Sequence, residues 1–210
     1  QTYENLVEDE INKENLFSEF EKVEIVNFGI ARTHLPQHIA RIDKIVPDFN
    51  PQVVIFTAHS DEARRVMSNL YRVYVDSLEI DYDYLNTLFA ELNLPRTVDE
   101  ATFVRALKPR INEFIGWGLN HIKEKTESMG AVPVWMFVPA LDEKPTPEQD
   151  ELLYLQAKAM GYYILDLRNF NGTVPDEDLI IGSWDRHPNA AGHQLLANKM
   201  YQELINNKEL

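Results

Sequence analysis

The chain has 210 residues, of which 44% are hydrophobic and 26% are charged, as in an ordinary folded protein rather than a disordered one. Asp and Glu outnumber Lys and Arg by 34 to 20, and the net charge of -14 argues against a nucleic-acid partner, whose phosphates would be repelled. The chain contains no cysteine, which excludes disulfides, thiolate nucleophiles and cysteine-based metal sites.

In the first part of the chain, apolar residues recur with helical spacing in some segments and form short runs in others. These patterns predict a helix at 3–16, a strand at 22–28, a helix at 33–46 and a strand at 53–58. The segment 53–58 is apolar almost throughout, which is typical of a strand buried on both faces of a parallel sheet.

The remaining segments continue the alternation after a long helical stretch. Helices are predicted at 63–75, 82–92 and 98–128, and Pro109 is expected to kink the last one. They are followed by a strand at 131–138, a helix opened by Pro145 and Pro147 and ending near Met160, a strand at 162–167, a turn-rich loop at 169–182 and a helix at 189–205.

Strands that alternate with helices predict parallel β-α-β units and an α/β fold class. We expect one α/β domain over 1–210, with a helical insertion at about 62–128. The apolar run at 131–141 is too short to span a bilayer, and the first residues are acidic rather than signal-like. We therefore expect a soluble chain without a membrane span, in a compartment that the sequence leaves open.

The segment Ser183–Ala197 carries the clearest chemical signal, because Asp185 and His187 stand two residues apart just before a helix. A carboxylate at this spacing can hold an imidazole in one tautomer and stabilise its protonated form, as a general base requires. From spacing alone, the simpler reading is that Asp185 caps the helix and that His187 is a loop residue.

Residues 185–193 include Asp185, His187, Pro188, Asn189, Gly192 and His193, and resemble the last sequence block of the SGNH, or GDSL-type, esterase superfamily. Segments 23–37 and 50–61 are similar to the second and third blocks of that family. The resemblance covers most of the chain except the helical stretch after Asp61, and it implies a three-layer α/β/α sandwich with a parallel sheet and flavodoxin-like topology.

The resemblance implies a lipase-like ester hydrolase or acyl-ester transferase that works through a Ser acyl-enzyme, with no cofactor or metal. The substrate would be a small-molecule, glycan or lipid ester. The implied site residues are His187 as general base, Asp185 as its orienting acid, the Arg32 amide with Ser60 or His59 as oxyanion donors, and Gly29, Asn189 and Arg64 as weaker substrate contacts.

The sequence also departs from the family pattern. Arg32 stands where the family usually has glycine, residues 58–61 read Ala-His-Ser-Asp instead of Gly-x-Asn-Asp, and one residue instead of two separates Asp185 from His187. No Gly-Asp-Ser segment precedes the first helix. We expect a separate N-terminal segment to supply the first strand and the serine; otherwise the fold has been rebuilt without a nucleophile.

The rival function is a catalytically inactive domain of the same kind that binds a glycan, a lipid or a protein. His34 and His38 stand four residues apart, but no acid or third histidine lies nearby, so we expect no metal site. The aromatic residues between 71 and 117 predict a helical core, part of which could wall a ligand pocket. Arg64 and Arg65 are expected on a solvated face, with an anionic substrate as the alternative.

Overall fold

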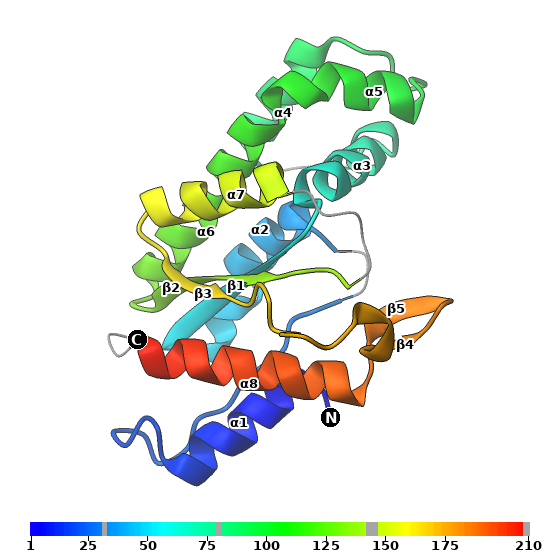
Figure 1. The fold of residues 1–210 in the computed structure, drawn as a ribbon. Helices are drawn as coiled ribbons and strands as arrows, with labels where there is room; N and C mark the ends of the chain where they lie inside the picture. The colour runs from blue at the N-terminus through cyan, green and yellow to red at the C-terminus, as the bar shows by residue number, and fades with distance from the viewer. Residues whose placement is uncertain (31–32, 79–80, 142–146, 208–210) are drawn as a thin grey trace. The chain divides into compact units, whose positions relative to one another are not determined.

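The computed structural model describes residues 1–30, 33–78, 81–141 and 147–207 (Figure 1). The chain divides into two compact units. Unit 1 consists of Gln1–Gly29, Gln52–Ser60 and Ala131–Leu210, and unit 2 of Ile30–Pro51 and Asp61–Gly130. No helix within the described part of the chain is both long and apolar enough to cross a membrane.

Unit 1 is built on a parallel sheet with the strand order β1-β2-β3. The strands are β1 (Val53–His59), β2 (Val132–Val138) and β3 (Tyr163–Asp166), and the register pairs Val53 with Val132 and Val134 with Tyr163. The predicted strands at 53–58, 131–138 and 162–167 and their parallel arrangement are therefore confirmed, because each is a short apolar run bounded by polar or turn-forming residues.

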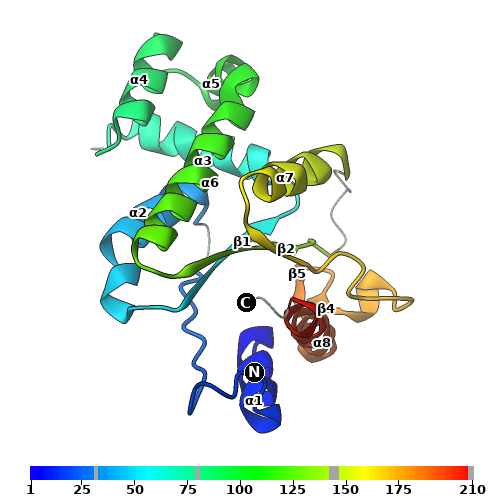
Figure 2. The same ribbon diagram turned by 90° about the vertical axis from the view of Figure 1, so that its left-hand side faces the viewer.

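Helices cover both faces of this sheet. Helices α1 (Tyr3–Glu14) and α8 (Ala190–Asn206) pack side by side on one face, and α7 (Pro147–Ala159) lies on the other (Figure 2). Side chains alternate along β2, so that Val134 and Met136 join the core under α1 and α8, whereas the Trp135 ring lies 6.2 Å from Tyr154 of α7.

The segment 22–28, predicted as a strand, pairs with no described strand, and this prediction is wrong. Its backbone hydrogen bonds go to side chains of α1 instead. The side chain of Asn12 accepts the N–H of Val23 and donates to its carbonyl, both at 2.8 Å, and Glu8 accepts the N–H of Ile25 at 2.7 Å. The alternating pattern correctly indicates an extended chain, but it does not reveal which groups take the backbone hydrogen bonds.

The predicted loop at 169–182 contains more structure than expected. A short 3-10 helix, η3 (Asp176–Asp178), leads into β4 (Ile180–Gly182), which pairs antiparallel with β5 (Asp185–Pro188). Ser183 and Trp184 form the turn of this hairpin, and Trp184 is 82% exposed. The sequence pattern does not predict this hairpin, because β5 consists of Asp, Arg, His and Pro, which do not form the alternating apolar pattern of a strand.

Unit 2 is helical in its described residues. Helix α2 (Leu35–Lys44) packs against α6 (Ile111–Ser128), and a Cβ at Gly118 would lie 2.8 Å from Leu35 Cδ2, so glycine permits their close approach. Where one kinked helix is predicted over 98–128, a 3-10 turn around Pro109 separates two helices, because proline lacks the N–H that a continuous helix needs. The other helical elements are η1 (Val46–Phe49), α3 (Glu62–Val75), α4 (Asp83–Leu92), α5 (Glu100–Leu107) and η2 (Lys108–Arg110).

Candidate active site

Asp185 and His187 form a direct contact on β5. Asp185 Oδ1 lies 2.5 Å from His187 Nδ1 and also accepts the backbone N–H of His187 at 3.0 Å. These two hydrogen bonds hold the pKa of Asp185 below its usual value. The His187 side chain is 84% exposed, so its Nε2 is accessible to a reacting group. This is the arrangement of an imidazole oriented by a carboxylate.

The helix cap that the simpler reading assigned to Asp185 is made by Asn189. Asn189 Oδ1 accepts the N–H of Gly192 at 3.0 Å, and its Nδ2 donates to the carbonyls of Asp178 and Ile180 at 2.9 and 3.0 Å. A Cβ at Gly192 would lie 2.6 Å from the carbonyl oxygen of Leu179. Glycine therefore allows the start of α8 to press against the hairpin that carries His187.

A partly buried polar cluster lies close to this pair within unit 1. The ring of His193 stacks on Tyr3 with centroids 6.1 Å apart, and Glu4 and Thr57 lie close enough to the Tyr3 hydroxyl to affect its pKa. Burial raises the pKa of Tyr3. Burial also lowers the pKa of His193; the Glu4 carboxylate opposes this shift, and the nearby His187 adds to it. The sequence does not predict this cluster, because Tyr3 and Glu4, Thr57 and His193 come from segments that are far apart in the chain.

The expected oxyanion donors are engaged elsewhere or cannot be placed. Ser60 is buried and its Oγ accepts the N–H of Ala140 at 3.4 Å, while His59 Nδ1 lies 3.2 Å from the carbonyl oxygen of Val138. Arg32 lies outside the described residues. The structure thus brings Asp185 and His187 together and does not show the three oxyanion candidates as donors to a common point.

The weaker substrate contacts have local roles. The N–H of Gly29 donates to Asn27 Oδ1 at 2.6 Å, and Asn189 joins the hairpin to α8 as described above. Arg64 belongs to unit 2, where it forms an ion pair with Asp61. Neither Gly29 nor Arg64 contributes a described hydrogen bond to the Asp185–His187 pair.

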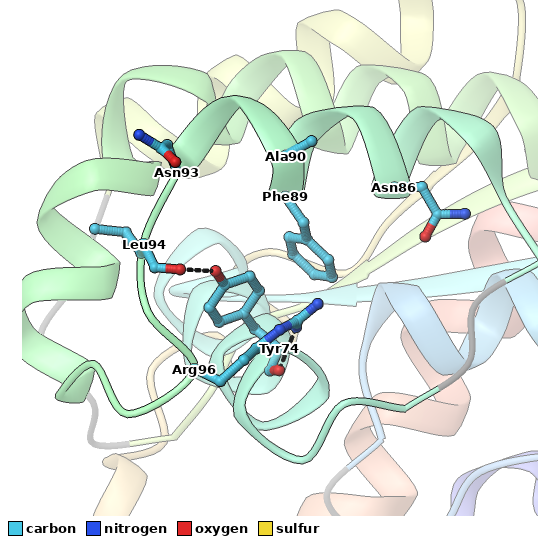
Figure 3. A pocket seen from close by; sticks show the side chains of 7 residues that line it. All are labelled: Tyr74, Asn86, Phe89, Ala90, Asn93, Leu94 and Arg96. Atoms are coloured by element: carbon cyan, nitrogen blue, oxygen red, sulfur yellow. Dashed lines mark hydrogen bonds between the residues drawn. The ribbon is translucent and has the colours of Figure 1, made fainter.

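Unit 2 has a cavity of about 280 Å³ next to the aromatic core of its helices (Figure 3). The guanidinium of Arg96 lies 4.0 Å from the centre of the Tyr74 ring and donates to the Tyr74 carbonyl, and the Tyr74 hydroxyl donates to the carbonyl of Leu94. The Tyr74 ring also packs against Phe89 and Phe103, which are both buried. The predicted aromatic core is confirmed for these side chains.

Among the described residues, no group of three or more His, Asp and Glu side chains is placed to hold a metal ion. His34 directly precedes α2, and His38 lies within it.

The fold and the site define an α/β protein with a parallel sheet and an Asp–His pair on a hairpin. No family model and no curated protein sequence matches the chain. A solved structure does match: LAE5, an alpha/beta hydrolase enzyme from the metagenome of Lake Arreo, Spain. The match has a TM-score of 0.57 and 18% identity, and it covers 96% of this chain and 80% of that chain. At 18% identity, this match shows a similar fold and nothing further.

This finding corrects the SGNH assignment. The matching structure is an alpha/beta hydrolase, which has a different fold from SGNH, and no family model or sequence match supports the SGNH family. The resemblance depends on three short blocks that contain few residues each. A strand followed by polar residues, or an Asp–His pair before a helix, can occur in different α/β folds, so these blocks are too short to specify the family.

Proposed function

We propose that this protein is a hydrolase of carboxylic esters in which His187 is the general base and Asp185 orients and stabilises its imidazole. The observation that carries this proposal is the 2.5 Å contact between Asp185 Oδ1 and His187 Nδ1, with the imidazole otherwise open to solvent. The similarity in fold to LAE5, which is described as a hydrolase enzyme, supports the reaction class.

The proposed chemistry needs a hydroxyl at Nε2 of His187. A serine Oγ would lose its proton to Nε2 as it attacks the ester carbonyl carbon, and Nε2 would return that proton to the departing alcohol. A water molecule, activated by the same nitrogen, would then hydrolyse the acyl-enzyme. Asp185 would stabilise the imidazolium in both steps and would itself remain ionised, in keeping with its lowered pKa.

We propose further that the serine comes from a segment outside residues 1–210, which adds a strand to the sheet. The open side of β1 supports this. The N–H of Val132 bonds the carbonyl of Gln52, so the alternate residues Val53, Ile55 and Thr57 turn their backbone groups away from β2. β1 is the edge strand of the described sheet and is largely apolar, a combination that favours pairing with another strand.

The remaining site residues are proposed in supporting roles. Within unit 1, Ser60 or His59 would stabilise the oxyanion after exchanging its present partner for the substrate. Asn189 would hold the hairpin in place. Gly29 would be a weaker substrate contact.

Fluorophosphonate labelling of the protein purified from its natural source tests the nucleophile, because this reagent reacts covalently with an activated serine. We expect labelling of a serine outside residues 1–210, and we expect His187→Ala to abolish it. A label on Ser60 or Ser183 would contradict the external nucleophile. If the folded protein is neither labelled nor able to hydrolyse esters, the binding-domain alternative replaces the proposal.

A further inference from the structure

The turn of the β4–β5 hairpin carries Trp184, which at 82% is the most exposed large hydrophobic side chain among the described residues. Figure 1 shows the tip of this hairpin extending away from the helices of unit 1. Apolar aromatic surface is unfavourable to leave in water, and most of this indole is available to a ligand. Trp184 also directly precedes Asp185, the residue that holds His187.

Gly182 sets the position of the Trp184 ring. A Cβ at Gly182 would lie 2.8, 2.9 and 3.0 Å from Cη2, Cζ3 and Cζ2 of Trp184, closer than a real Cβ approaches another atom. Three nearly equal distances to neighbouring ring atoms place that Cβ over the face of the indole and not beyond its edge. One face of the ring therefore packs on Gly182, and the opposite face is turned to solvent. A ring held in this way loses little conformational freedom when a ligand stacks on it.

The ring lies on the same side of the hairpin as the Asp185 carboxylate. Gly182 and Asp185 are opposite each other in the hairpin, and the side chains of opposed residues project from the same side of a sheet. The Trp184 ring covers Gly182 on that side. Trp184 and His187 are three residues apart, so their Cα atoms are separated by no more than about 11 Å. A molecule that stacks on the ring can therefore extend to the imidazole of His187.

The surroundings of the ring favour a sugar over a purely apolar ligand. The face of an indole is electron-rich and attracts the weakly positive C–H groups of a pyranose. The chain neighbours of Trp184 are polar, namely Ser183, Asp185 and Arg186, and such groups suit a ring that carries hydroxyls at its edge. An acyl chain needs an enclosed apolar groove to leave water, whereas this ring is open at the tip of a hairpin. The net charge of -14 also opposes contact with an anionic bilayer.

We propose that Trp184 is a specificity-determining residue that stacks on the sugar ring of an O-acylated carbohydrate and so presents the ester to His187. This rests on the proposed ester hydrolysis and names the alcohol part of its substrate. Cleavage of the ester C–O bond transfers the acyl group to the serine and releases a sugar hydroxyl, which takes up the proton held by His187 Nε2. Every residue of this chain that takes part lies in unit 1.

Hydrolysis rates of two kinds of ester test this role in the protein purified in its natural form. The sugar esters are the peracetylated methyl glycosides of glucose, xylose and N-acetylglucosamine, and ethyl acetate is the comparison ester without a ring. We expect a higher kcat/KM for at least one sugar ester than for ethyl acetate. Trp184→Ala should lower kcat/KM for that sugar ester about tenfold, while kcat/KM for ethyl acetate changes less than about twofold. Trp184→Phe, which keeps an aromatic face, should retain most of the sugar-ester activity.

Two further variants separate the position of the ring from general damage to the hairpin. Gly182→Ala keeps the indole but displaces it, so kcat/KM for the sugar ester should fall as it does in Trp184→Ala. Ile181→Ala is the matched control, because Ile181 is also exposed on β4 but projects from the side opposite to Gly182, and both rates should stay unchanged. The proposal is overturned if no sugar ester is preferred, or if Trp184→Ala affects the sugar ester and ethyl acetate equally.

Binding measured without hydrolysis distinguishes a failure of this proposal from a failure of the hydrolase assignment. The methyl glycosides of the same three sugars, without acetyl groups, should include one that shifts the tryptophan fluorescence in a saturable way. Trp184→Phe should remove the shift, since Trp135 is fully buried and Trp117 belongs to unit 2. If the shift is found but esters are not hydrolysed, the hydrolase assignment fails and sugar stacking on Trp184 stands. A missing shift overturns the stacking role whether or not esters are hydrolysed.

Discussion

Asn12 binds both backbone groups of Val23, with its Nδ2 donating to the carbonyl and its Oδ1 accepting the N–H, each at 2.8 Å. One turn earlier on α1, Glu8 accepts the N–H of Ile25, and one turn before that, Glu4 accepts the side chain of Asn27. The contacts recur every four residues on α1 and every two residues on the extended segment. Four residues of helix rise about 6 Å and two residues of extended chain about 6.6 Å, so the spacing of the contacts is nearly equal on the two elements.

We therefore predict that Asn12→Ala destabilises unit 1 by about 1–3 kcal/mol, because it leaves two backbone groups of Val23 without their partner. The free energy of unfolding in urea measures the loss, and amide hydrogen exchange at Val23 should become faster. Asn5→Ala on the same helix is the control, since the described contact of Asn5 is to the side chain of Thr2. Equal stability of the two variants would show that the pairing of α1 with this segment contributes little.

The junction between the hairpin and α8 gives a second prediction. Asn189→Ala removes the cap of α8 and the donors to Asp178 and Ile180, and should cost about 2 kcal/mol in the free energy of unfolding. The control is Asn198→Ala, at an exposed position of α8 where the side chain contacts Gln194. If thermal and urea denaturation do not distinguish these variants, Asn189 does not anchor the hairpin.

The lowered pKa of His193 leads to a prediction of how the stability of unit 1 depends on pH. Because burial lowers its pKa below the ordinary 6.5, the unfolded chain binds a proton more readily than the folded one. This contribution to stability is present above about pH 6.5 and is lost as the pH falls further. Hydrogen exchange of the β2 and β3 amides should show weaker protection at pH 5.5 than at pH 7.5.

His193→Gln, which cannot bind that proton, should reduce the pH dependence. The readout is restricted to unit 1 because His34, whose pKa is also lowered, adds a pH dependence of its own in unit 2. An unchanged pH dependence in the His193→Gln variant would assign the effect to other groups.

Sequence patterns predict the parts of this molecule in which the hydrophobic period decides the structure. The strand at 53–58 is found because its apolar run has few other interpretations, and the Asp185–His187 contact because the two residues are close in the chain. The segment 22–28 is misassigned because its partners are side chains of a helix. The cluster of Tyr3, Thr57 and His193 cannot be predicted locally, since tertiary folding alone brings these residues together.

The rate of ester hydrolysis tests the central role of His187 most directly. For the protein purified in its natural form, we expect His187→Ala to lower kcat/KM for nitrophenyl acetate by about 10²–10⁴, the usual contribution of a general base, and Asp185→Asn to lower it as well. His121→Ala is the matched control, because His121 also contacts a carboxylate, Asp43, at 3.0 Å but belongs to unit 2. The account predicts a large loss in the His187 variant and none in the His121 variant, whereas unchanged hydrolysis by the His187→Ala variant would contradict it.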